Sequence, residues 1–237
     1  MNWRSWIPPF ARRFLRDRLY AARLRRDPFR IGLDAMAPHL PSAAVIVEAG
    51  AHAGGDTRAL ARRWPAGRVY ALEPIPELYA ALVESVADQS NVSCHQLALG
   101  PENAQLPMWV SSGASDGSSS LRAPKTHLTS HPDVTFDDVV TVESVTLDSF
   151  AAAQGIEPDL LWLDLQGGEL DALRAGEHVL RSARLIHAEV SVLEEYEGCA
   201  LYPEVREWLA TRGFEVLVEA LPPDEPQGNV LFLRSAG

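Results

Sequence analysis

From residue 42 onward the chain alternates between short apolar segments and segments with helical spacing, and this alternation constrains the fold more than any other feature. Apolar strands that alternate with helices indicate an α/β protein with a mostly parallel sheet covered by helices on both faces. The pattern predicts seven strands, at 45–49, 68–72, 92–98, 160–164, 184–190, 214–219 and 229–233. It predicts helices at 55–64, 76–87, 168–181 and 201–212.

Two departures from the alternation add detail to this fold. The last two strands are joined only by "ALPPDEPQG", without a crossover helix, so we expect them to pair as a C-terminal antiparallel hairpin. Residues 100–145 replace an expected helix with strand-like pieces, Ser/Gly runs and two histidines, His127 and His131. Insertions of this kind often build the mouth of a site.

The charge pattern separates an arm from the body of the protein. Residues 1–30 hold nine Arg and two Asp, which gives them a local charge of +7. Because the whole chain has a net charge of -11, the remaining residues carry a net charge of -18. We expect residues 1–41 to form an arginine-rich helical arm and residues 42–237 to form one domain, in which 100–145 is an inserted acceptor-side segment. An acidic body repels phosphate backbones, which argues against nucleic acid as a partner.

The arm leaves two hypotheses open. Either its helix packs on the body or on a second subunit of a homo-oligomer, or it lies on an anionic membrane surface. The two cysteines, Cys94 and Cys199, are too few for a disulfide framework, and no apolar run approaches a membrane span. We therefore expect a cytoplasmic protein, with peripheral contact at the inner membrane surface as the alternative.

A glycine-rich turn follows the first predicted strand, in the segment "VEAGAHAGGDT" at 47–57. In an open parallel sheet the first strand-to-helix turn is the usual ligand contact. Gly50 allows a tight turn, and Gly54 and Gly55 allow the backbone to approach a ligand. Glu73 ends the second strand, where a carboxylate can accept both ribose hydroxyls of a nucleoside.

The same turn discriminates between nucleoside cofactors. A dinucleotide fingerprint requires a glycine where this chain has His52, which argues against NAD. S-adenosylmethionine has no phosphate, and its ammonium group suits an acidic residue at Glu48 beside small residues. The alternative is that Glu48 caps or ion-pairs in an ordinary strand-to-helix turn.

Several blocks of the sequence resemble the FkbM family of S-adenosylmethionine-dependent methyltransferases. "VEAGAHAGGDT" is similar to the family's V-D-V-G-A-N-x-G-x-x-T, and "ALEPIPELYAAL" to its acidic-Pro block. "NVSCHQLALG", "DGSSSL", "VTLDSF" and "LWLDLQGGELDALRAG" follow in the family's order, and the resemblance spans roughly 42–234. Two positions depart from the pattern, with Glu48 in place of Asp and His52 in place of Asn.

The resemblance implies a Rossmann-like class I methyltransferase that methylates hydroxyl groups of sugars or secondary metabolites, with a small molecule or glycan as acceptor. The matching positions imply a cofactor site made of Glu48, Gly50, His52, Gly54, Thr57, Glu73 and Pro74. By the same resemblance, Ser119 and Ser120 would lie near the methionine end of the cofactor or at the acceptor mouth.

Methyl transfer to a weakly acidic hydroxyl benefits from a base or a metal ion. Asp164 closes the fourth predicted strand, Glu189 closes the fifth and Glu169 begins the helix between them. Neighbouring strand ends lie ~4.8 Å apart, so we expect Asp164 and Glu189 to face one acceptor or to share Mg²⁺ or Ca²⁺. Glu169 is either a third catalytic group or a helix cap; His127 and His131 are alternative bases.

Two other classes of function stay open at this point. A non-catalytic binding or scaffold protein can keep the cofactor fold, although it has no physical need for carboxylates at three strand ends. An NAD-dependent oxidoreductase is the less favoured alternative because of His52.

Overall fold

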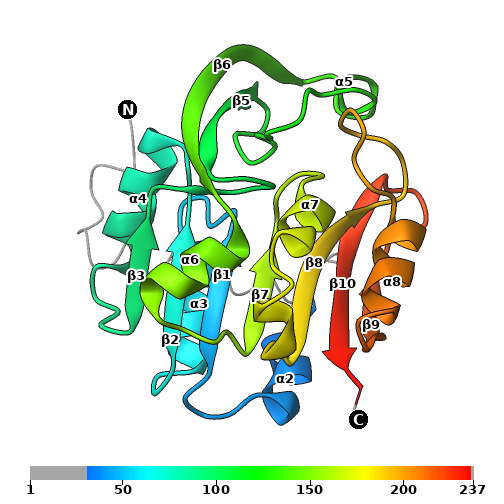
Figure 1. The fold of residues 1–237 in the computed structure, drawn as a ribbon. Helices are drawn as coiled ribbons and strands as arrows, with labels where there is room; N and C mark the ends of the chain where they lie inside the picture. Colours follow the sequence, from blue (N-terminus) through cyan, green and yellow to red (C-terminus); the bar gives the residue numbers. More distant parts are fainter. Residues whose placement is uncertain (1–30, 236–237) are drawn as a thin grey trace, which may run out of the picture.

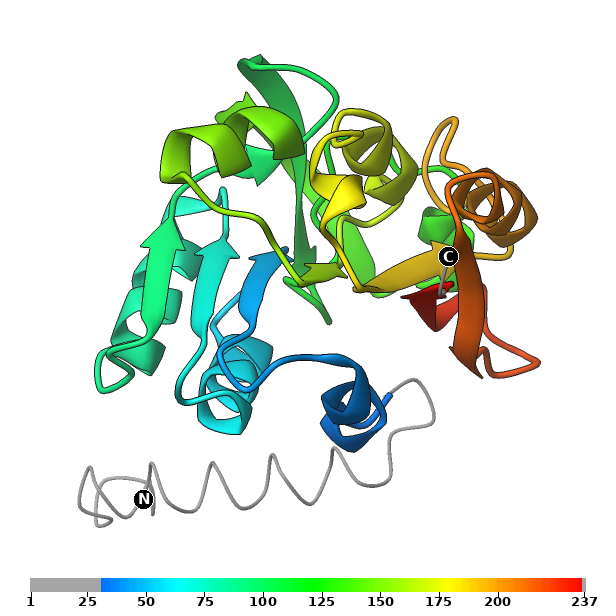
Figure 2. The same ribbon diagram turned by 60° about the horizontal axis from the view of Figure 1, so that its bottom comes forward.

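A computed structural model describes residues 31–235, drawn in Figure 1 and, turned by 60°, in Figure 2. The helix predicted within residues 1–30, with its expected subunit or membrane contacts, lies outside the described residues. Residues 31–41 of the predicted arm contain a short helix, α2 (Leu33–Met36), and a 3-10 turn, η2 (Ala37–His39). Met36 is completely buried against one face of the central sheet.

The central sheet has seven strands in the order β3-β2-β1-β7-β8-β10-β9. All neighbouring pairs are parallel except the two pairs that contain β10. The strands are β1 (Val45–Ala49), β2 (Arg68–Leu72), β3 (Val92–His95), β7 (Leu160–Leu163), β8 (Leu185–Ser191), β9 (Phe214–Ala220) and β10 (Gln227–Arg234). The predicted fold class and the C-terminal antiparallel hairpin are confirmed.

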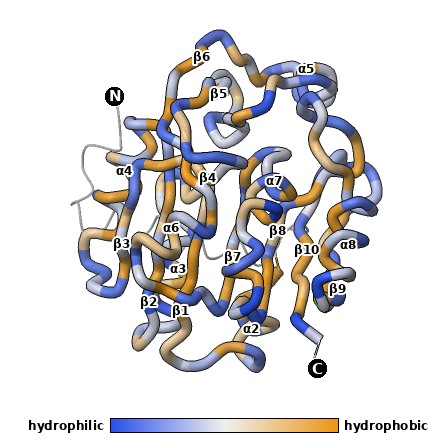
Figure 3. The backbone as a smooth tube through the Cα atoms, in the orientation of Figure 1, coloured by the Kyte–Doolittle hydropathy of each residue, from blue (hydrophilic) through white to orange (hydrophobic). Residues whose placement is uncertain are grey.

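Helices cover both faces because alternate residues of the central strands are apolar on each side. In β1, Ile46 packs toward α2 and α3, whereas Val47 packs toward α6, α7 and α8. Figure 2 shows these two helical layers on opposite sides of the sheet, and Figure 3 shows β1 and β7 as mainly hydrophobic. The helices of the two layers are α3 (Gly55–Arg63), α4 (Pro76–Val86), α6 (Leu147–Gln154), α7 (Glu169–Arg174) and α8 (Tyr202–Ala210).

The inserted segment forms most of a second, three-stranded sheet in the order β4-β6-β5. Its strands are β4 (Ala98–Leu99), β5 (Ala104–Gly113) and β6 (Val134–Val145), and a short helix, α5 (His127–Ser130), lies between β5 and β6. In Figure 1 this sheet stands above the carboxyl ends of the central strands. The predicted strand 92–98 is wrong at its end, because the chain leaves the central sheet after His95 and pairs with β6 instead.

The helix predicted at 168–181 is also wrong in its second half. α7 ends at Arg174, and a 3-10 turn, η3, covers Val179–Arg181. The carboxylate of Asp148 in α6 accepts hydrogen bonds from the backbone N–H groups of His178 and Val179, at 3.0 and 2.9 Å. This tertiary cap begins a new turn and interrupts the helix that the apolar spacing predicted. Within residues 31–235 no helix is long and apolar enough to cross a membrane.

Candidate active site

A cavity of about 1630 Å³ lies beyond the carboxyl ends of β1, β2 and β7, beneath the second sheet. Its wall comes from the turn after β1, the end of β2, the end of β7 and the segment 97–122. An open parallel sheet usually binds its ligand at the point where the order of its strands reverses. Here that point is at β1, because β2 lies on one side of β1 and β7 lies on the other. The lining includes Glu48, Gly50, His52, Glu73, Pro74, Ser119 and Asp164.

The turn after β1 is shaped by two glycines with left-handed backbone conformations. Gly50 has φ +83°, and a Cβ there would lie 1.9 Å from the carbonyl oxygen of Asp164. Gly54 has φ +79°, and a Cβ there would lie 2.9 Å from Leu82 of α4. Gly55 lines the cavity, whereas Gly54 does not and lets the turn pack against α4, so a ligand contact at Gly54 stays a prediction.

Glu48 is the most deeply buried carboxyl group of the cavity wall, with an exposed fraction of 1%. Among residues 31–235 its Oε2 atom has no hydrogen-bond partner. Burial raises the pKa of Glu48 well above its ordinary value, the charge of Asp56 raises it further, and Thr57 partly offsets the shift. Thr57 is completely buried in α3 and does not line the cavity, so it lies behind Glu48. An unpaired buried carboxyl oxygen favours a ligand that brings a hydrogen-bond donor or a positive charge.

Glu73 is held in a fixed orientation at the end of β2. Its Oε2 accepts a hydrogen bond from the backbone N–H of His52 at 2.9 Å, and its Oε1 accepts one from Ile75 at 3.0 Å. Burial raises the pKa of Glu73, although these two backbone donors oppose the shift. A carboxylate fixed in this way keeps free lone pairs for two ligand hydroxyls.

The side chain of His52 contacts the inserted segment. Its backbone has φ +48°, and its Nε2 lies 2.9 Å from Oδ1 of Asp116. The pair therefore connects the turn after β1 with the loop after β5, across one side of the cavity. The sequence did not indicate a role for Asp116.

The end of β7 carries a polar network that sequence reasoning found only in part. The amide nitrogen of Gln166 donates to Oδ1 of Asp164 at 2.8 Å and to Oε2 of Glu189 at 2.7 Å. Gln227 of β10 donates to the other oxygen of Glu189 at 2.9 Å. The hydroxyl of Tyr196 lies 2.8 Å from the Gln166 side-chain oxygen. Gln166 belongs to the "LDLQGGE" block, which was the available signal, but the sequence alone predicted no role for it.

The two carboxyl groups of this network are linked electrostatically. Burial raises the pKa of Asp164, and its contact with Gln166 opposes that shift. Burial, followed by the nearby charge of Asp164, raises the pKa of Glu189 well above its ordinary value. Asp164 lines the cavity, whereas Glu189 lies behind Gln166 and does not. The expected adjacency of the two residues is therefore present: their carboxyl groups interact directly, and the amide of Gln166 contacts one oxygen of each.

Glu169 has the geometry of a cap. Its Oε1 accepts a hydrogen bond from the backbone N–H of Leu165 at 2.7 Å, and the residue does not line the cavity. Burial raises the pKa of Glu169 to about 8. Of the two alternatives for this residue, the structure favours the stabilisation of the turn between β7 and α7 over contact with a substrate.

The "DGSSSL" segment, residues 116–121, both lines the cavity and supports it: Asp116, Gly117, Ser119 and Leu121 are lining residues, whereas Ser120 is not. Ser119 lines the cavity, and its hydroxyl accepts a hydrogen bond from the backbone N–H of Ser111 at 2.9 Å. Ser120 is buried, and its hydroxyl donates to the backbone oxygen of Gln166 at 2.8 Å. Ser120 therefore attaches the inserted segment to the turn that carries the polar network.

The sheet order and the position of the cavity define a class I methyltransferase fold. The chain belongs to the FkbM methyltransferase family: the model of the "Methyltransferase FkbM domain" matches residues 48–216, more than half of the chain. The family that the sequence blocks predicted is thus confirmed.

Individual proteins agree with this assignment. The chain is 32% identical over 160 residues to the 2-O-methyltransferase NoeI of Sinorhizobium fredii (strain NBRC 101917 / NGR234). The match covers 65% of this chain and 66% of NoeI, just under two thirds of that relative's length.

Solved structures share the fold at low identity. A crystal structure of Methyltransferase FkbM from Methylobacillus flagellatus KT has a TM-score of 0.55 at 13% identity, over 81% of this chain and 44% of that one. An rRNA methylase from Streptococcus thermophilus has a TM-score of 0.52 at 13% identity, over 89% and 98% of the two chains.

Proposed function

We propose that this protein transfers the methyl group of S-adenosylmethionine to a hydroxyl oxygen of a sugar, a glycan or a glycosylated small molecule. Membership of a methyltransferase family supports the reaction class. The printed name of NoeI, a 2-O-methyltransferase, supports an oxygen acceptor.

One observation carries the choice of methyl donor. The unpaired oxygen of Glu48 and the fixed carboxylate of Glu73 line the same cavity, at the ends of adjacent strands. S-adenosylmethionine brings an ammonium group that can pair with the first carboxylate and a ribose whose two hydroxyls can donate to the second. Bound there, it supplies an electrophilic methyl group for in-line displacement.

The residues at the end of β7 suit the acceptor side of the reaction. The carboxyl groups of Asp164 and Glu189 are hydrogen-bonded to each other, which requires a proton on one of them. We assign this proton to Glu189, since burial and the neighbouring charge of Asp164 both favour its neutral form. Asp164 is then the ionised member and faces the cavity, where it can accept the proton of an acceptor hydroxyl. Burial raises the pKa of Asp164, which makes it a stronger base than an exposed aspartate. Gln166 holds both carboxyl groups in place.

A Mg²⁺ or Ca²⁺ ion shared by Asp164 and Glu189 is a separate hypothesis. It requires the Gln166 side chain to move, because its amide nitrogen lies within 2.8 Å of one oxygen of each carboxyl group. A cation that bridges those two oxygens would need the same space. The hypothesis predicts that Mg²⁺ or Ca²⁺ restores turnover to the chelator-treated protein; catalysis by Asp164 alone predicts that neither ion changes it.

Titration calorimetry with S-adenosylmethionine and with its demethylated product tests the donor site. Glu48→Gln keeps the size of the side chain but removes its charge, so we expect binding to weaken by about 10- to 100-fold. Glu77→Gln, at an exposed position in the first turn of α4, is the matched control and should bind like the wild type. Absence of binding by the wild type at millimolar donor would reject the proposal in favour of a non-catalytic protein. Transfer of a labelled methyl group to a panel of glycans then tests the acceptor class.

A further inference from the structure

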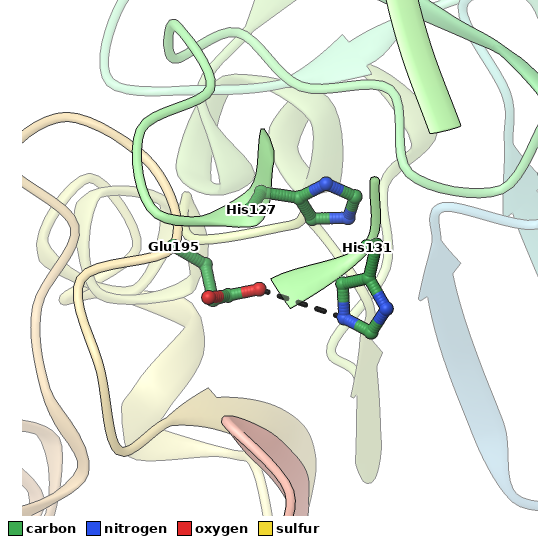
Figure 4. A group of neighbouring side chains, drawn as sticks. All are labelled: His127, His131 and Glu195. Carbon is green, nitrogen blue, oxygen red and sulfur yellow. Dashed lines mark ion pairs between the residues drawn. The ribbon is translucent and has the colours of Figure 1, made fainter. Parts of the chain in front are cut away.

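A second group of convergent side chains lies outside the cavity, between the inserted segment and the loop that follows β8. It consists of His127 and His131, at the two ends of the short turn that contains α5, and Glu195 (Figure 4). The four-residue spacing of the histidines places both rings on one side of a helical turn. One nitrogen of each ring and one carboxylate oxygen lie within 4.8 Å of one another. None of the three residues lines the cavity.

Two buried polar atoms of this group lack hydrogen-bond partners. Glu195 is completely buried; its Oε1 accepts hydrogen bonds from the hydroxyls of Thr126 and Ser130, at 2.9 and 2.8 Å. Within residues 31–235 its Oε2 forms no hydrogen bond, and Nε2 of His131 lies 3.6 Å from it. Nδ1 of the buried His127 also has no partner. A buried carboxylate oxygen without a partner, such as Oε2 of Glu195, is costly unless a ligand satisfies it.

We propose that His127, His131 and Glu195 bind one divalent transition-metal ion, with Zn²⁺ as the best match. Two imidazoles and one carboxylate are typical zinc ligands, whereas Mg²⁺ and Ca²⁺ prefer oxygen ligands alone. Zinc–ligand bonds of roughly 2.0–2.2 Å in a tetrahedron place the donor atoms about 3.4 Å apart. The three donors lie within 4.8 Å of one another, and the His131–Glu195 pair, at 3.6 Å, is close to that spacing.

The protonation state of His127 agrees with such a site. Burial and the neighbouring His131 lower the pKa of His127, against the opposing charge of Glu195. This direction favours the neutral ring, and a histidine must be neutral to coordinate a metal ion.

The bound ion would fasten two segments that are distant in the sequence. Their backbones already touch, since the N–H groups of Lys125 and His127 donate to the carbonyl oxygen of Glu195 at 2.8 and 3.2 Å. The next residue, Tyr196, places its hydroxyl 2.8 Å from the side-chain oxygen of Gln166. A metal ion at Glu195 would thus stiffen the support of Gln166 without contact with the substrate.

The test uses the untagged full-length chain after treatment with a chelator and dialysis, titrated with ZnCl₂ by calorimetry. We expect one ion per chain, a higher melting temperature with Zn²⁺, and visible ligand-field absorption with Co²⁺ in its place. His131→Ala should weaken Zn²⁺ binding at least tenfold and remove the thermal shift. His178→Ala removes an exposed imidazole elsewhere in the chain and should leave both unchanged.

Melting curves recorded without metal show whether each variant folds. Glu195→Gln is a second variant: its amide oxygen can still accept the hydrogen bonds of the Thr126 and Ser130 hydroxyls, and we expect the same loss of Zn²⁺ binding. Equal Zn²⁺ affinity in the wild type and in the folded His131→Ala and Glu195→Gln variants would overturn the proposal, as would a wild type that binds no Zn²⁺. Donor binding at Glu48 is measured separately, so failure of this site is distinguishable from failure of the proposed function.

Discussion

The two halves of the cavity are built in different ways. At the ends of β1 and β2, Glu48 and Glu73 belong to consecutive strands, and Glu73 is held by backbone N–H groups of the two adjoining turns. At the end of β7, Asp164 depends on Gln166, which contacts side chains from β8 and from the loop after it. The first half is a local arrangement with polar backbone partners, and the second is a side-chain network assembled from distant segments. We therefore expect substitutions in the first half to affect donor binding and substitutions in the second half to affect turnover.

Replacement of Asp164 by Asn is expected to have the largest effect. The amide keeps the contact with Gln166 but cannot accept a proton, so turnover should fall by about 10²- to 10⁴-fold. Donor affinity, measured by calorimetry, should change by less than about threefold. Single-turnover transfer of a labelled methyl group measures the loss. A comparable loss of donor affinity would mean that the two halves are not separate in function.

Replacement of Gln166 by Glu should reduce turnover less, by up to about 10²-fold, because a third carboxyl group would displace Asp164 from its position. The same assay at saturating donor measures the change. Gln154→Glu, at the exposed end of α6, adds the same charge elsewhere and should leave turnover unchanged. If Gln166→Glu is as active as the wild type, the network does not position Asp164.

Replacement of Glu169 by Gln changes the pH dependence of stability. The pKa of Glu169 is about 8 in the folded protein and roughly 4.3 in the unfolded chain. Because the folded state binds the proton more tightly, the wild type loses stability as the pH rises from roughly 4.3 to about 8. Glu169→Gln should escape this loss, on the order of a few kcal/mol. Urea unfolding at pH 5 and pH 9 tests this; the same stability difference at both pH values would contradict it.

Replacement of Asp116 by Asn should have the smallest effect. Its contact with His52 joins two partly exposed side chains, with exposed fractions of 69% and 42%. Exposed ion pairs contribute little, so donor affinity should change by less than about threefold. A larger loss in calorimetry would show that the His52–Asp116 contact closes the first half of the cavity over the donor.

Much of the fold could be predicted because local patterns encode it. The strands 45–49 and 68–72 match β1 and β2, since each is a short apolar run that ends at a carboxylate and a turn. The errors occur where tertiary contacts compete with local preference, as with Asp148, which caps a new turn inside the predicted helix 168–181. The packing of Gly54 against α4 could not be predicted, because a sequence cannot show that this helix passes within van der Waals distance.

The sequence by itself determined the alternation of strands and helices, the family, and the presence of carboxylates at the ends of three strands, because these features lie in short continuous segments. Only the tertiary structure decided that the amide of Gln166 contacts both Asp164 and Glu189, and that His127 and His131 meet Glu195 away from the cavity. These contacts depend on which strands are neighbours and on where the inserted segment packs. Such choices follow from burial summed over the whole chain, and no single stretch of residues records them.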